Sequence, residues 1–131
     1  MKFLKSSMAD LPEKPRAFLD ANVLLAGSAF PRWPYEVLEH AADGDFQPIL
    51  SPLVIKQARK HLQKRFPEHL SRFEEFIQET EYELAPDPSS EEIEANKSLI
   101  RDLSDVSVAL AAINVKAEYL VSEDKDFTVQ D

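Results

Sequence analysis

Short apolar segments alternate along the chain with stretches of helical periodicity, and this alternation limits the fold more than any other feature. Buried strands are predicted at residues 16–19, 46–50 and 119–121, with a weaker strand at 81–85. Helices are predicted to begin near Pro34, Ser51-Pro52, Leu70, Ser89 and Ser104. Residues 20–27 are expected to form a turn that leads into helical or irregular chain. Strands separated by helices predict an α/β fold, a three-layer sandwich around a central, mainly parallel sheet.

The length and composition indicate one domain inside the cell. The chain has 131 residues and no cysteine, which fits a single domain in a reducing compartment. Residues 1–15 show no periodic pattern and are expected to be an N-terminal tail, with one domain over residues 16–131. The apolar runs are shorter than the about 18 residues needed to span a membrane, and the N-terminus lacks a signal-peptide pattern. We therefore expect a cytoplasmic protein that does not bind membranes.

Three aspartates stand where ligands bind in a parallel sheet, beyond the carboxyl ends of the strands. Asp20 follows the first strand, Asp124 follows the last, and Asp105 lies in the first turn of the helix that precedes the last strand. Taken singly, Asp105 can complement a helix dipole and Asp124 can form a turn. Together they would repel one another strongly, so their convergence would require a hard cation such as Mg²⁺ or Mn²⁺. The histidines share no metal-ligand spacing.

A basic stretch stands out in a chain with a formal charge of −9. An acidic protein repels nucleic acid at long range, although bound cations would reverse the field at an acidic site. Five of the fifteen basic residues fall in one predicted helix: Lys56, Arg59, Lys60, Lys64 and Arg65. They form either an ordinary solvated helix face or an RNA-binding edge beside the site.

Three segments resemble the acidic motifs of PIN domains. Ala17-Phe18-Leu19-Asp20-Ala21-Asn22 is similar to the opening motif, which has an Asp and an Asn two residues later. The segment beginning Asp105-Val106-Ser107-Val108 resembles the third motif, an Asp that opens an Ala-rich helix. The segment Ser122-Glu123-Asp124-Lys125-Asp126-Phe127 resembles the closing turn. The motifs come in the family's order, and the resemblance covers roughly residues 16–127.

The resemblance implies a Mg²⁺- or Mn²⁺-dependent ribonuclease, often the toxin of a toxin–antitoxin pair. In this interpretation Asp20, Asp105 and Asp124 hold the metal and carry the catalysis, and Asp126 is an additional metal ligand. Asn22 and Ser122 would position the acids or the substrate. RNA is the implied substrate, and the resemblance leaves open an antitoxin protein and a homodimer as partners.

The sequence departs from the family pattern at two places. The family carries a Glu on the helix after the second strand, where this chain has Gln57. A Gln keeps a carbonyl oxygen but loses the charge, so metal affinity should fall. The family also continues past the last acidic turn into another strand, whereas this chain ends at Asp131, as expected of a truncated or compact variant.

Two other functions compete with the ribonuclease hypothesis. Gln57 favours a degenerate PIN module that binds RNA or a protein without cleavage. A phosphatase of the haloacid dehalogenase type would need an acid two residues after its nucleophilic Asp, and Asn22 occupies that position. The sequence also lacks a glycine-rich phosphate loop, which argues against a nucleotide-binding domain.

Overall fold

A four-stranded parallel sheet forms the centre of the protein in the computed structural model, which describes residues 14–98 and 103–122. The strand order is β3-β2-β1-β4, and each neighbouring pair is parallel. The strands are β1 (Arg16–Leu19), β2 (Gln47–Leu50), β3 (Glu83–Leu84) and β4 (Tyr119–Val121). The predicted α/β class is confirmed, and β1 and β4 have the predicted bounds. The prediction that 119–121 is a buried strand is wrong, because β4 lies at the edge of the described sheet with Tyr119 exposed and Leu120 and Val121 half-buried. Strand β3 is much shorter than expected, because only two of its residues pair with β2.

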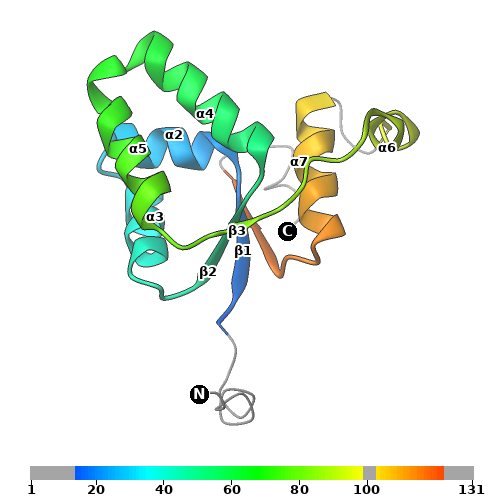
Figure 1. Cartoon of the computed structure of the whole chain (residues 1–131), viewed down its shortest axis with the longest axis horizontal. Helices are drawn as coiled ribbons and strands as arrows, with labels where there is room; N and C mark the ends of the chain where they lie inside the picture. The colour runs from blue at the N-terminus through cyan, green and yellow to red at the C-terminus, as the bar shows by residue number, and fades with distance from the viewer. Residues whose placement is uncertain (1–13, 99–102, 123–131) are drawn as a thin grey trace.

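Helices cover both faces of the sheet, as the three-layer prediction required (Figure 1). One layer holds α2 (Ala21–Ala29), α3 (Trp33–Ala42), α4 (Pro52–Arg65), the 3-10 turn η1 (Pro67–His69) and α5 (Leu70–Glu79). The other layer holds α6 (Ser90–Ala95) and α7 (Leu103–Asn114). Phe18, Leu19, Ile49 and Leu50 are fully buried in the two central strands, so the core lies between the sheet and these helices.

Local signals in the sequence explain where several helices begin and end. Ser51 caps α4, because its side chain accepts a hydrogen bond from Val54 N. Ser89 and Glu92 form the predicted capping box at the start of α6. Gly44 follows α3 with a φ of 81°, a left-handed conformation that glycine adopts at little cost.

Helix α2 is more regular than the sequence indicated for residues 20–27. It runs without interruption for nine residues and buries Val23, Leu24 and Gly27. A Cβ at Gly27 would lie 2.6 Å from Leu38 Cδ1 and 2.8 Å from Pro34 O, so the glycine permits close contact between α2 and α3. Because α2 is apolar on nearly every side, its sequence has no polar stripe from which a helix could be predicted.

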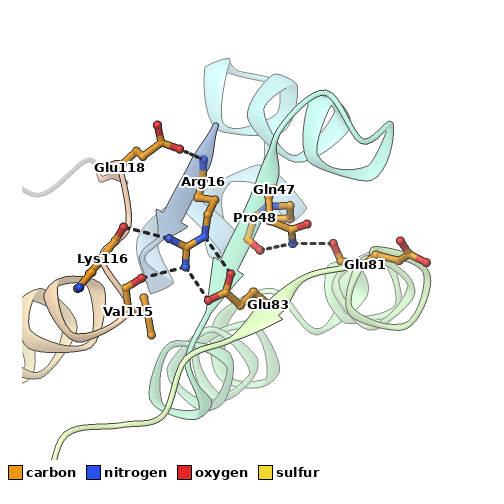
Figure 2. A network of polar contacts seen from close by, with 8 residues as sticks. All are labelled: Arg16, Gln47, Pro48, Glu81, Glu83, Val115, Lys116 and Glu118. Carbon is orange, nitrogen blue, oxygen red and sulfur yellow. Dashed lines mark hydrogen bonds and ion pairs between the residues drawn. The ribbon is translucent and has the colours of Figure 1, made fainter. Parts of the chain in front are cut away.

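Arg16 joins three parts of the fold at the amino-terminal edge of the sheet (Figure 2). Its guanidinium donates two hydrogen bonds to the Glu83 carboxylate, which lies on β3, two strands away from β1. It also donates to the carbonyl oxygens of Val115 and Lys116, just beyond the end of α7. Cations are favourable at a helix C-terminus, so Arg16 fixes α7 relative to the sheet from the edge opposite Asp20.

Candidate functional site

Asp20 is a buried carboxylate at the carboxyl end of the central strand β1. Only 5% of the residue is exposed, and its backbone N–H donates to Val121 O of the neighbouring strand β4. Its Oδ1 accepts a hydrogen bond of 3.0 Å from Val23 N and so caps α2. Its Oδ2 accepts a hydrogen bond of 2.5 Å from Ser122 Oγ, just beyond β4. Both carboxylate oxygens are therefore held in a fixed orientation by groups 102 and 3 residues away in sequence.

The auxiliary residues predicted from the sequence occupy different environments. Ser122 lies directly against Asp20, which gives it the positioning geometry that the prediction required. Asn22 is exposed in the first turn of α2, the helix that Asp20 caps. Gln57 is half-buried on α4, which begins at the carboxyl end of β2, the neighbour of β1. Of these residues, Ser122 is hydrogen-bonded to Asp20, whereas Asn22 lies on α2 and Gln57 lies on α4.

The other predicted acids lie largely outside the described residues. Asp105 belongs to the first turn of α7, but its side chain is outside the described part, as are Asp124 and Asp126. Helix α7 runs antiparallel to the strands and begins at the end of the molecule to which their carboxyl ends point (Figure 1). The backbone therefore brings the position of Asp105 to the same end of the sheet as Asp20.

Asp87 is an acid at this edge that the sequence analysis did not select. It follows β3 in an exposed loop between two prolines, and its Oδ1 accepts a hydrogen bond of 3.2 Å from Leu53 N at the start of α4. The proline-flanked sequence indicates only a loop, because Leu53, which Asp87 contacts, lies 34 residues earlier in the chain. Asp87 satisfies a free N–H of the helix terminus and stabilises it.

One of the five basic residues on α4 has a structural partner. The Arg59 guanidinium donates to both carboxylate oxygens of Glu74 on α5, at 2.7 and 2.9 Å. The hydrogen bond lowers the pKa of Glu74 and raises that of Arg59. Since the Glu74 pKa is depressed, this stabilisation is present above the ordinary carboxyl pKa and is lost as the pH falls through the lowered value.

The remaining basic residues on α4 are exposed, and none forms an ion pair with a described residue: Lys56, Lys60, Lys64 and Arg65. Gln57, Lys60 and Lys64 are spaced three and four residues apart and therefore share one face of the helix. Val54, Ala58 and Leu62 form the buried face. Lys60 and Lys64 thus lie on the same side of α4 as the predicted site residue Gln57, and Arg59 points toward α5.

Among the described residues, Asp20 is a buried donor at the carboxyl edge whose chemistry suits a hard divalent cation. Within residues 14–98 and 106–122, no three acids or histidines gather closely enough to hold a metal. The Asp20 carboxylate is nevertheless an oxygen ligand of the required type, oriented by a helix N–H and a hydroxyl. Carboxylates that bind a metal are typically held in place by additional hydrogen bonds of this kind.

Comparisons with known proteins agree with this architecture. The PIN domain family matches residues 16–126. A crystal structure of PAE2754 from Pyrobaculum aerophilum superposes with a TM-score of 0.61 at 17% identity, covering 86% of this chain and 82% of that one. A search of curated proteins gives no match. Across the described ranges, no helix has the length and apolar character needed to cross a bilayer.

The family match extends over most of the chain and contains every residue of the predicted acidic site, from Asp20 to Asp126. Family membership supports a nuclease-type function, RNA binding and use of a divalent metal at the level of the whole family. The match and the fold agree, because the structural relative shares the same layered arrangement at low sequence identity. The chain therefore belongs to the PIN domain family.

Proposed function

We propose that this protein is a metal-dependent endoribonuclease that hydrolyses phosphodiester bonds in single-stranded RNA. The observation that carries the proposal is the buried Asp20 carboxylate, held by Val23 N–H and Ser122 Oγ at the carboxyl end of the central strand. A buried carboxylate costs free energy unless it is hydrogen-bonded or bound to a cation, and such groups concentrate at functional sites. The family match supports the nuclease class.

In this mechanism Asp20, Asp105 and Asp124 would hold the metal, and Asp126 would be an additional ligand. A bound Mg²⁺ or Mn²⁺ supplies an activated water and neutralises negative charge on the phosphodiester. Ser122 keeps the Asp20 carboxylate from rotating, and the N-terminus of α2 adds positive potential beside the phosphate. Asn22, exposed one residue into α2, is available to orient the RNA.

The direct test is incubation of the purified protein with end-labelled single-stranded RNA in Mg²⁺, in Mn²⁺ and in EDTA. We expect internal cleavage with either metal and none in EDTA. Binding of the RNA without cleavage under all three conditions would support the competing function, a degenerate PIN module, for which Gln57 is the main argument. The absence of both binding and cleavage would contradict the proposal.

We further propose that the protein acts in the cytoplasm as the toxin of a toxin–antitoxin pair. An antitoxin would be a protein partner, and the toxin could also pair with a second copy of itself. Induced expression should then arrest growth, and the Asp20→Asn variant should not. Growth arrest by both forms would show that toxicity does not depend on cleavage.

Restoring the acid at position 57 should increase both metal affinity and activity. Gln57→Glu adds a charged oxygen ligand on the helix beside Asp20, so we expect Mg²⁺ affinity and cleavage rate to rise on the order of tenfold. Gln63→Glu, on an exposed part of the same helix, is the matched control and should change neither. Adding Asp20→Asn to Gln57→Glu should remove the gain. If Gln57→Glu has no effect on an active protein, another acid completes the site.

The exposed lysines of α4 should contribute to RNA affinity by neutralising phosphates. Replacing Lys56, Lys60 and Lys64 with Ala should weaken binding and flatten its salt dependence, by about 0.7 in log–log slope for each phosphate that is no longer neutralised. The double variant Arg59→Gln/Glu74→Gln removes a cation of the same helix with its partner and should leave the slope unchanged. If the slope is unchanged in the triple variant, the lysines of α4 do not contact RNA and form an ordinary solvated helix face.

A further inference from the structure

A cluster of aromatic side chains remains partly exposed where α2 and α4 end. The aromatic cluster consists of Phe30 and Phe66 together with Arg32, and it is taken to include the neighbouring exposed Trp33, which begins α3 three residues after Phe30 in the chain. The Phe30 and Phe66 rings meet edge to face, with centroids 5.3 Å apart and planes inclined by 82°. The Arg32 guanidinium carbon lies 5.7 Å from the centroid of the Phe30 ring. Trp33 is 47% exposed and Phe30 is 37% exposed, so this aromatic cluster presents ring surface to solvent.

The aromatic cluster lies at the far end of two helices that start beside the candidate site. Helices α2 and α4 begin at the carboxyl ends of β1 and β2 and pack against each other (Figure 1). Phe30 follows the last residue of α2, and Phe66 follows the last residue of α4. Since α4 has 14 residues, the cluster is separated from the start of α4 by about 21 Å.

Basic side chains lie next to the aromatic rings and along α4 between the cluster and the candidate site. Arg32 stands between Phe30 and Trp33 in the chain, and Lys64 and Arg65 form the last turn of α4. Lys60 and Lys64 lie on the face of α4 that also carries Gln57, so the free cations extend along the helix. Exposed aromatic rings combined with a basic track are the features by which proteins bind single-stranded nucleic acid without sequence preference.

We propose that the aromatic cluster is a second RNA contact, at which Trp33 stacks on a base several nucleotides away from the cleaved phosphate. The inference rests on the proposed ribonuclease function and deepens it. Arg32 favours RNA over an apolar protein surface as the occupant, because its exposed guanidinium can pair with a phosphate while the exposed Trp33 ring is available for stacking. The substrate is then a single strand long enough to follow α4, and short oligonucleotides cannot reach the cluster.

Trp33 is the only tryptophan in the chain, so its fluorescence reports directly on the cluster. The Asp20→Asn variant, in which cleavage is expected to be at least about a hundredfold slower, is titrated with single strands of about 4 and about 16 nucleotides, the range of lengths that such sites occupy. We expect the long strand to quench Trp33 emission and the short strand to leave it unchanged. Trp33→Ala should weaken binding of the long strand on the order of tenfold, and Trp33→Phe should retain most of the affinity.

The control is Tyr119→Ala, which removes an exposed aromatic side chain from β4 and should not change RNA affinity. If the protein cuts RNA but long strands leave Trp33 emission and the Trp33→Ala affinity unchanged, the second contact is wrong and the proposed function stands. If Trp33→Ala changes the oligomeric state and leaves RNA affinity intact, the cluster is an interface between copies and the inference is overturned. If the protein neither binds nor cuts RNA of any length, the proposed function itself fails.

Discussion

Replacing Asp20 with Asn should reduce metal-dependent RNA cleavage by at least about a hundredfold while leaving the protein folded, because a metal ligand contributes several kcal/mol to the transition state. Asn retains a side-chain oxygen for Val23 N–H and is as good a helix cap as Asp. The substitution therefore removes charge with little change in shape. Cleavage rates of end-labelled RNA at saturating Mn²⁺ give the effect directly.

A second variant separates the chemical role of Asp20 from its structural role. Asp20→Ala removes the cap as well as the charge, so it should also lower the free energy of unfolding by about 0.5–2 kcal/mol. Urea denaturation of both variants measures this difference. If Asp20→Asn cleaves RNA at the rate of the natural protein, Asp20 is only a helix cap and the site assignment is wrong.

Replacing Phe73 with Ala should cause the largest loss of stability, about 3–5 kcal/mol. Phe73 is the buried residue of α5 and is fully inaccessible to solvent. The Arg59 guanidinium carbon lies 5.6 Å from the centroid of its ring while also pairing with Glu74, so the ring supports the packing of α4 against α5. Such a loss is a large part of the about 5–15 kcal/mol that stabilises a typical domain.

Urea denaturation followed by circular dichroism measures the effect, with Phe76→Ala as the matched control. Phe76 lies on the same helix but is only half-buried, so its removal should cost less than removal of Phe73. Equal losses at the two positions would show that burial does not distinguish them. A loss below about 1 kcal/mol at Phe73 would contradict its place in the core.

Much of the fold could be predicted because its signals are local. The apolar runs before Asp20 and Ser122 indicate parallel strands, although only the first of these strands is buried, and Ser51-Pro52 and the Ser89–Glu92 pair indicate helix starts. Helix α2 was less clear, since a helix buried on most sides has no amphipathic period. The extent of β3 depends on pairing with β2, which the sequence of residues 81–85 does not determine by itself.

The candidate site depended more on interactions between distant segments. The position of Asp20 after a buried strand marked it as unusual, but the hydrogen bond from Ser122 joins residues 102 positions apart. Arg59 resembles its basic neighbours in sequence, and only its pairing with Glu74, 15 residues later, sets it apart. Asp87 caps a helix that begins far away in sequence. Local patterns marked Asp20 and Arg59 as candidates but not Asp87, and only the tertiary structure reveals the partners of all three.

Titration calorimetry of Mn²⁺ into the natural protein and into Asp20→Asn tests the central claim most directly. The proposed function predicts that the natural protein binds Mn²⁺ and that Asp20→Asn loses this binding, because the neutral amide cannot offset the charge of the cation. Glu83→Gln, at the opposite edge of the sheet, controls for loss of an unrelated acid and should bind as the natural protein does. Equal Mn²⁺ affinity in the natural protein and Asp20→Asn would contradict a metal site built on Asp20.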